Sequence, residues 1–445
     1  MKLEKPQNTT EQDETTRQDS SPNEPETPSV APEVSNESPD EVSEDIMALE
    51  ISEGREEKFD TRGRKKYRTQ KPKKEKRYWE VVTPGLGDFE KRIGKILDLG
   101  SRKGQVQEIF SAKKFKGLRV NPLLVQSAEG VKEIRDELVD HGIDVIHLAW
   151  YPDGFVVPVE HIEAVMELPM YKEGLVFIQN PSSFLPILAL DPQPGEKYLD
   201  VCSAPGGKAA LYAGLSQGKS ELHLVDDNPF RVNKKMREVL KSQKVVPSEI
   251  IISDARHLIT QGKITPESFD KVLVDVDCSS EGKINFESKD PLEQWKFKSA
   301  DQFSHLQLKI LLTGYEALKP GGVLVYSTCT LSPEENEGVI SRFLERTPSA
   351  IVQKLLFKGQ SVYDAITNWP GQDIVSEVTK TLRVDPRDPY MEGFYVCRII
   401  KPFPEDETPE GQKNKQRNID LANETVDLDQ LGQKHSRLKK DEEQQ

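Results

Sequence analysis

Three of the four cysteines in this chain stand where a thiol could do chemistry. Cys202, Cys278 and Cys329 each follow a short apolar run typical of a buried strand, and acidic residues stand beside them. A single buried cysteine is most often a small, inert apolar residue. Cysteines at three strand ends are harder to explain by packing, because interior strand positions would serve packing equally well. We therefore predict a sheet edge at which a thiolate acts as a nucleophile.

A tight turn follows the first of these strands. The segment Cys202–Lys208 (CSAPGGK) is neither a Walker phosphate loop nor the G-x-G-x-x-G of dinucleotide folds. Its Pro-Gly-Gly run lets the backbone approach a ligand at a helix start, which accepts a carboxylate as readily as a phosphate. Asp226, about twenty residues further on, is placed to hold ribose hydroxyls. A ligand with a ribose and a carboxylate but no pyrophosphate suggests S-adenosylmethionine.

Short apolar strands alternate with amphipathic helices from residue 197 onward. Near-continuous Val, Ile and Leu runs with helical crossovers predict a mostly parallel α/β sheet that is buried on both faces. Ligands of such sheets bind at the carboxyl ends of the strands, where the cysteines and acids gather. The expected strands are Lys197–Val201, Glu221–Asp226, Glu249–Ser253, Lys271–Val276, Val323–Thr328 and Gly393–Ile400, and the expected helices are Gly207–Leu215, Pro229–Gln243, Asp301–Leu318 and Pro333–Arg346.

A smaller α+β unit is expected before this sheet, over residues 79–180. Its polar and apolar residues alternate with mixed periods, which favours short helices and strands. The expected helices are Asp88–Leu97, Gln105–Phe110, Ala128–His141 and Val159–Leu168, and the expected strands are Lys116–Asn121, Asp144–Leu148 and Gly154–Val157.

Both ends of the chain, residues 1–78 and 404–445, are predicted to be disordered. They are polar, charged and poor in aromatic residues, so they cannot bury a core. Within the first, residues 61–78 carry ten Lys or Arg against one Glu. Such a run is either a solvated linker or a flexible arm on RNA phosphates, and both interpretations stay open. The net charge of −14 averages over these segments and does not exclude a nucleic acid as partner.

The sequence also favours a cytoplasmic protein. No apolar run approaches the roughly 20 residues needed to cross a bilayer, and the acidic N-terminus does not resemble a secretory signal. Four cysteines are too few for a disulfide framework, and none form the C-x-x-C pairs of a zinc site. We expect a monomer that binds neither a metal nor a membrane.

Three motifs resemble those of the NOL1/NOP2/Sun family of RNA cytosine-5 methyltransferases. They are DVCSAPGGK at Asp200–Lys208, DVDCSSEG at Asp275–Gly282 and YSTCTLSPEENE at Tyr326–Glu337. The resemblance covers roughly residues 89–400, with both tails outside it. It implies a Rossmann-like class I methyltransferase domain over residues 181–403, with a mostly parallel seven-stranded sheet.

The resemblance also implies residue roles. The segment GLRVNPL resembles part of the family's RNA-binding subdomain, in which Arg119 and Asn121 would contact RNA. The catalytic set would be Cys329, Cys278, Asp275 and Lys208. The residues that would bind S-adenosylmethionine are Cys202, Ser203, Ala204, Pro205, Gly206, Gly207, Lys208, Asp226, Arg231, Asp254 and Asp275.

Two positions depart from the family's pattern. Asp277 stands where the family has a Pro before its second cysteine, and Glu281 replaces a small or polar residue. A carboxylate that met the thiol of Cys278 would raise its pKa, which bears on product release. On a strand, however, neighbouring side chains point to opposite faces.

The expected chemistry explains why these residue types are needed. Carbon 5 of cytosine is a poor nucleophile until a thiolate adds to carbon 6, so covalent catalysis is the natural solution. The resemblance makes Cys329 the attacking thiol and Cys278 the one that assists release. Asp275 can hydrogen-bond at N3 of the base, and Lys208 can hold the base or favour a thiolate. The target base must be unstacked or single-stranded.

Several functions compete on the sequence alone. Ribosomal RNA is favoured as the substrate by family analogy, with transfer RNA as the alternative. A catalytically weak RNA-binding or ribosome-assembly factor of the same fold is a rival because of Asp277. A small-molecule methyltransferase would have no use for the basic run or for two strand-end cysteines. A redox enzyme is disfavoured because the C-x-x-C spacing is missing.

Overall fold

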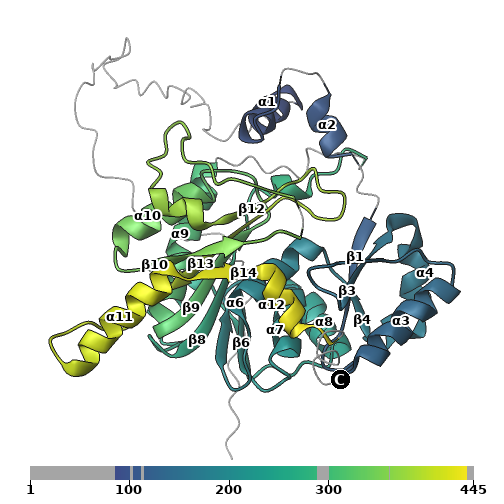
Figure 1. Cartoon of the computed structure of the whole chain (residues 1–445), viewed down its shortest axis with the longest axis horizontal. Coiled ribbons are helices and arrows are strands. Elements are labelled where there is room, and N and C mark those ends of the chain that lie inside the picture. Colours follow the sequence, from purple (N-terminus) through teal and green to yellow (C-terminus); the bar gives the residue numbers. More distant parts are fainter. Residues whose placement is uncertain (1–85, 101–103, 112–114, 288–299, 360, 438–445) are drawn as a thin grey trace, which may run out of the picture. The chain divides into compact units, whose positions relative to one another are not determined.

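A computed structural model describes residues 86–100, 104–111, 115–287, 300–359 and 361–437 (Figure 1). The N-terminal segment 1–78, including its basic run, lies outside these residues, so its disorder and its RNA contacts stay predictions. Within the described part, no helix combines the length and the apolar character needed to cross a membrane.

One large mixed sheet carries the catalytic motifs. Its predicted strands are β5 (Lys197–Asp200), β6 (Glu221–Asp226), β7 (Glu249–Ile252), β8 (Phe269–Asp275), β9 (Leu318–Thr328) and β13 (Phe394–Ile400). Strands β7, β6, β5, β8 and β9 are adjacent and parallel, and β13 runs antiparallel to β9. The predicted α/β class is therefore confirmed.

The sheet is larger than the seven strands that were predicted. It has ten strands among the described residues, namely the six above and four that were not named from the sequence: β10 (Ile351–Leu356), β11 (Val362–Tyr363), β12 (Leu382–Val384) and β14 (Thr425–Asp427). Three of these are only two or three residues long, too short to show a period. Strand β10 contains the polar residues Gln353 and Lys354, which interrupt its apolar residues, so the sequence pattern does not identify it as a buried strand.

Helices cover both faces of the large sheet. Leu224 packs in one apolar cluster and its neighbour Val225 in another, because successive strand residues point to opposite faces. Both faces are thus apolar, which explains the near-continuous apolar runs in the sequence. The helices concerned are α6 (Leu185–Leu190), α7 (Gly207–Leu215), α8 (Arg237–Ser242), α9 (Ala300–Ala317) and α10 (Glu337–Arg346), and a π-helical turn, Arg231–Met236, leads into α8.

The smaller α+β unit is built on a second, four-stranded sheet of order β2-β3-β1-β4 (Figure 1). Its strands are β1 (Phe115–Val120), β2 (Ile146–His147), β3 (Gly154–Pro158) and β4 (Val176–Ile178), with helices α3 (Ala128–Asp140), α4 (Ile162–Glu167) and α5 (Pro169–Lys172). Leu118, Val131 and Phe155 meet in its apolar core. Strand β4 and helix α5 were not predicted.

The first two helices do not belong to this small unit, which corrects the predicted boundary at residue 79. Helices α1 (Leu86–Ile96) and α2 (Gln105–Ile109) form an apolar cluster with Ile284, Leu331 and Trp369 of the catalytic region. Figure 1 shows them apart from the small sheet. The N-terminal helices therefore cover the loops that carry the catalytic motifs.

The C-terminal segment was predicted to be disordered from residue 404, and this is wrong up to residue 437. It forms α11 (Pro409–Asn423), strand β14, which pairs with β10, and α12 (Leu428–His435). The hydroxyl of Ser436 donates to Asp153 at 2.6 Å, and the backbone N–H of Arg437 donates to the same carboxylate. These long-range contacts hold a polar segment that has little apolar surface of its own.

Candidate active site

The two cysteines named in the sequence meet at the carboxyl edge of the large sheet. Cys329 directly follows β9 and Cys278 lies three residues beyond β8, and these strands are parallel neighbours. The two Sγ atoms are 3.3 Å apart. The hydroxyl of Ser280 lies 3.6 Å from the sulfur of Cys329 and 3.8 Å from that of Cys278. The predicted juxtaposition of two thiols is therefore present.

The two thiols differ in protonation. A hydrogen bond from Cys278, together with the charge of Lys283 and the hydroxyl of Ser280, lowers the pKa of Cys329 to about 6 despite its burial. The same hydrogen bond, with burial, raises the pKa of Cys278 well above its usual value. The two opposite shifts make Cys329 the thiol that ionises first and Cys278 the thiol that keeps its proton. A thiolate is the nucleophilic form of cysteine.

Lys283 is a site residue that the sequence reasoning missed. It lies on a turn directly after the Cys278 motif, and the negative charge of Cys329 raises its pKa. A cation shortly after a strand-end cysteine was the signal available in the sequence. Lys283 therefore joins the groups that stabilise the Cys329 thiolate.

Lys283→Met is expected to raise the pKa of Cys329, because a positive charge near the thiolate is lost. The acid limb of the pH profile of kcat/KM should then move to higher pH, because a higher pH is needed to form the Cys329 thiolate. Lys283→Arg keeps the charge and should keep the limb near the wild-type position. Methyl transfer measured from about pH 5 to about pH 9 tests this, and superimposable profiles for the Met variant and the wild type would remove Lys283 from the site.

Lys208 and Asp275 form the second predicted pair of the site. The ammonium of Lys208, in the first turn of α7, lies 2.7 Å from one oxygen of Asp275, at the end of β8. The hydroxyl of Ser327 donates to the other oxygen at 2.7 Å. The carboxylate is thus held on both sides, next to the strand that leads to Cys329.

Asp226 and the turn after β5 form a connected cradle. One oxygen of Asp226 accepts from the backbone N–H of Ala204 at 3.1 Å, and the other accepts from that of Asn228 at 3.0 Å. Gly206 has a φ of +96°, where any side chain would strain the backbone, and a Cβ at its position would also press on the Cγ of Met236 at 3.1 Å. The hydrogen bond from Ala204 therefore holds Asp226 against the turn that contains Gly206.

Arg231 connects this cradle to the unusual Asp277. Its guanidinium lies 3.1 Å from Asp226, 3.1 Å from Asp277 and 3.0 Å from the carbonyl oxygen of Ala204. The side chain of Asp277 is 72% exposed. The carboxylate of Asp277 is turned toward Arg231. Asp277 therefore pairs with a cation of the Asp226 cradle. The pKa of Cys278 is raised instead by Cys329, burial and Glu335.

Glu281, the other departure from the family's pattern, is a buried brace between the two cysteine loops. Ser279 follows Cys278 and donates to Glu281 at 3.0 Å, and Thr330, which follows Cys329, donates to the same oxygen. The hydroxyls of Ser279 and Thr330 are themselves 2.7 Å apart. Arg92 of α1 lies 3.5 Å from the other oxygen of Glu281 and compensates its charge. Helix α1 thus supports the geometry of the thiol pair.

Two residues predicted to bind RNA are buried. Arg119 and Asn121 are 0% and 1% exposed. Arg119 donates to Gln179 at 2.8 Å and to the carbonyl of Gly207 at 3.4 Å. Asn121 donates to the carbonyls of Gly174 and Gln243, both at 3.0 Å. These bonds join the small unit to the catalytic unit, so both side chains have a structural role here, and their contact with RNA stays a prediction.

The remaining predicted cofactor residues lie around the same edge. Ser203 is buried and its backbone N–H donates to the carbonyl of Val225 at 2.8 Å, which fixes the turn against β6. Asp254 follows β7, and both of its oxygens accept from the Nε of Arg256 at 2.9 Å. Cys202 is half-buried, and burial followed by the charge of Asp200 raises its pKa well above the usual value. Cys202 is therefore no second thiolate.

The chain is similar to known proteins. Residues 187–400 match the family model described as 16S rRNA methyltransferase RsmB/F. A tRNA (cytosine(49)-C(5))-methyltransferase from Pyrococcus abyssi is 30% identical over 317 residues, covering 71% of this chain and 98% of that protein. Ribosomal RNA small subunit methyltransferase B from Vibrio cholerae is 37% identical over 239 residues, covering 53% of this chain and 49% of that protein. A crystal structure of a methyltransferase homolog from Pyrococcus horikoshii matches with a TM-score of 0.59 and 28% identity, over 72% of this chain and 96% of that one.

Proposed function

This chain belongs to the NOL1/NOP2/Sun family of S-adenosylmethionine-dependent RNA cytosine-5 methyltransferases, and we propose that it methylates a cytosine of ribosomal RNA through a covalent bond from Cys329 to carbon 6 of the base. One observation carries this mechanism: the sulfur atoms of Cys329 and Cys278 lie 3.3 Å apart at the carboxyl edge of the sheet. Transfer to an atom that is already nucleophilic needs no thiolate, whereas carbon 5 of cytosine does.

The reaction begins when the Cys329 thiolate adds to carbon 6, which makes carbon 5 electron-rich. Negative charge develops on the N3 side of the ring, where Asp275 in its carboxylic acid form donates a proton, with the ammonium of Lys208 beside it. Bond formation consumes the anion that raises the pKa of Cys278. Cys278 therefore ionises more readily after the attack, releasing its own proton to solvent, and its thiolate then takes the proton that leaves carbon 5. The S–C6 bond then breaks and returns the thiolate of Cys329.

The cradle around Asp226 fits S-adenosylmethionine, which supplies an electrophilic methyl group. Gly206 admits close backbone approach at the start of α7, where a helix terminus favours a carboxylate. Asp226 offers a carboxylate that accepts hydrogen bonds from ribose hydroxyls. The guanidinium of Arg231 lies beside Asp226 and pairs with both Asp226 and Asp277. These contacts support the assignment of the cofactor to this edge.

Asp226→Ala is expected to weaken S-adenosylmethionine binding by about tenfold or more, because a charge-assisted hydrogen bond to the ribose is lost. RNA binding should change little, since Asp226 faces the cradle. Calorimetry with S-adenosylmethionine measures the first quantity and filter binding the second. Asp420→Ala, an exposed change on α11, is the matched control. A dissociation constant equal to that of the control would exclude Asp226 from the cofactor site.

Transfer RNA is a second candidate substrate because the Pyrococcus abyssi relative, which acts on it, matches over 98% of its own length. Unmodified transcripts of ribosomal RNA and of transfer RNA separate the two candidates. Each is incubated with labelled S-adenosylmethionine, digested to nucleosides and analysed for 5-methylcytidine. Label in ribosomal RNA alone supports the proposal, and label in transfer RNA alone replaces it with the alternative.

A further inference from the structure

Five cations form a compact basic ridge on the catalytic unit. They stand within eleven residues of the π-helical turn, α8 and the loop after it, and all are exposed: Lys234, Lys235, Arg237, Lys241 and Lys244. A single acid, Glu238, interrupts them. This concentration stands out in a chain whose net charge is −14.

The spacing of the ridge aligns its charges. Lys234, Arg237 and Lys241 are separated by three and four residues, which places them along one side of the π-helical turn and α8, and Lys244 lies in the turn after α8. The opposite face, with Val232, Met236 and Leu240, is buried. At about 1.5 Å per residue the helical part of the ridge, from Lys234 to Lys241, extends about 10 Å.

The charges of the ridge are not neutralised within the described part of the chain. None of the five cations forms an ion pair there, and the contact of Arg237 is a neutral one, to the amide oxygen of Asn233 at 3.2 Å. Nearby cations behave differently, because Arg231 pairs with Asp226 and Arg256 with Asp254. The ridge thus presents free positive charge to a partner.

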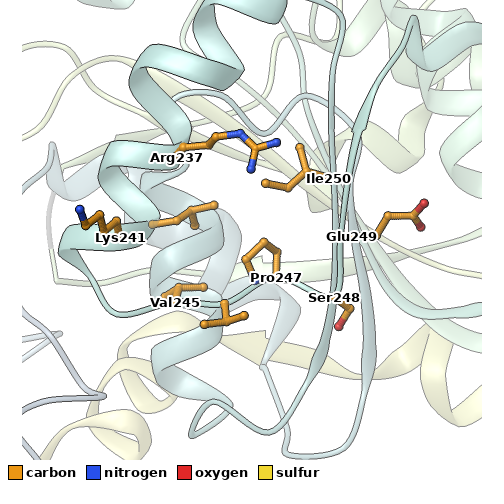
Figure 2. Close-up of a pocket in the computed structure, with 9 residues that line it drawn as sticks. Arg237, Lys241, Val245, Pro247, Ser248, Glu249 and Ile250 are labelled. Carbon is orange, nitrogen blue, oxygen red and sulfur yellow. The ribbon is translucent and has the colours of Figure 1, made fainter.

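The surroundings of the ridge fit a nucleic acid. Its N-terminal end lies three residues from Arg231 of the cofactor cradle, and Phe230 at that end is 64% exposed. A hollow of about 510 Å³ lies beside its C-terminal end, between α8 and β7. Figure 2 shows the guanidinium of Arg237 reaching across this hollow toward Ile250, while Lys241 points away from it. Exposed aromatic rings beside rows of cations suit unpaired bases on a phosphate backbone.

We propose that the basic ridge binds the phosphate backbone of the RNA substrate as it leaves the reaction edge, with Phe230 offering a surface on which an unpaired base stacks. This inference rests on the proposed function, since it assigns a contact surface to the same RNA. The surface lies within the catalytic unit and is distinct from the basic run at residues 61–78.

The test replaces two ridge cations in the full-length chain, Lys234→Gln with Lys241→Gln. The control is Lys413→Gln with Lys415→Gln, two exposed lysines of α11 that form no ion pair within the described residues. The probe is a fluorescein-labelled single-stranded RNA of about 20 nucleotides containing cytosines. The ridge variant should bind it about tenfold more weakly at about 0.1 M salt, and the slope of log K against log salt should fall by about 1.4.

Two further readouts separate this inference from the proposed function. S-Adenosylmethionine binding and kcat at saturating RNA should match the wild type, so that only the KM for RNA rises. If the ridge variant bound RNA with the same affinity and salt slope as the α11 control, the proposed RNA-binding role of the ridge would be wrong, even if the wild type makes 5-methylcytidine. An enzyme that binds RNA through the ridge but makes no 5-methylcytidine would instead overturn the proposed function. A loss confined to kcat would contradict a binding role.

Discussion

Cys329→Ala is expected to abolish both methylation and every covalent protein–RNA species, because the thiolate that attacks carbon 6 is gone. Cys278→Ala is expected to give the opposite phenotype. It keeps the attacking thiol, so it should methylate once and then stall with RNA attached, since the group that assists removal of the carbon-5 proton is missing. Turnover should fall by at least about two orders of magnitude in both variants, the usual contribution of a positioned acid or base being of this size.

Denaturing gels with labelled RNA distinguish the two cysteine variants. The matched control is Cys397→Ala, a buried cysteine of β13 that lies in the apolar core and outside the site. It should turn over and leave no trapped RNA. If the Cys329 variant trapped RNA and the Cys278 variant did not, the roles of the two thiols would be reversed.

Arg383→Met is expected to lower the free energy of unfolding by about 3–5 kcal/mol, because it leaves the buried carboxylate of Glu337 without its cationic partner. Arg383 and Glu337 are 1% and 0% exposed and form a two-pronged ion pair with distances of 2.6 and 2.5 Å. Arg383 also donates to the carbonyl of Leu331 at 3.0 Å and to the hydroxyl of Tyr363 at 2.8 Å. Its loss should therefore loosen the loop that follows Cys329.

Urea unfolding followed by circular dichroism measures the effect of Arg383→Met. Arg346→Met, at the exposed end of α10, is the control and should stay within about 0.5 kcal/mol of the wild type. The double variant with Glu337→Met removes both charges and should recover part of the loss. If Arg383→Met were as stable as Arg346→Met, the Arg383–Glu337 ion pair would make no measurable contribution to the free energy of unfolding.

The parallel half of the sheet and its reactive edge could be predicted because they follow from local patterns. Continuous apolar runs give the strands, and parallel strands bring their carboxyl ends to one edge. Cys278 and Cys329 are therefore neighbours although they are 51 residues apart. Their protonation could not be predicted from the sequence, because it depends on a 3.3 Å contact and on Lys283.

Distant partners decide the structure of two further segments. The resemblance of the GLRVNPL segment to the family's RNA-binding subdomain suggested RNA contacts for Arg119 and Asn121, yet their partners Gly207 and Gln243 lie 88 and 122 residues away. The C-terminal segment has the composition of a disordered tail. It is held by contacts such as that of Arg437 with Asp153, 284 residues away, which no local pattern contains.

The most direct test of the central claim uses RNA in which cytidine is replaced by 5-fluorocytidine. Fluorine on carbon 5 cannot leave as a proton would, so the bond between the enzyme and carbon 6 persists after methyl transfer. With S-adenosylmethionine present, the full-length protein should form a stable complex, and digestion followed by mass spectrometry should place the nucleotide on Cys329. A nucleotide attached to Cys278, or no attachment by an enzyme that methylates ordinary cytosine, would contradict the account.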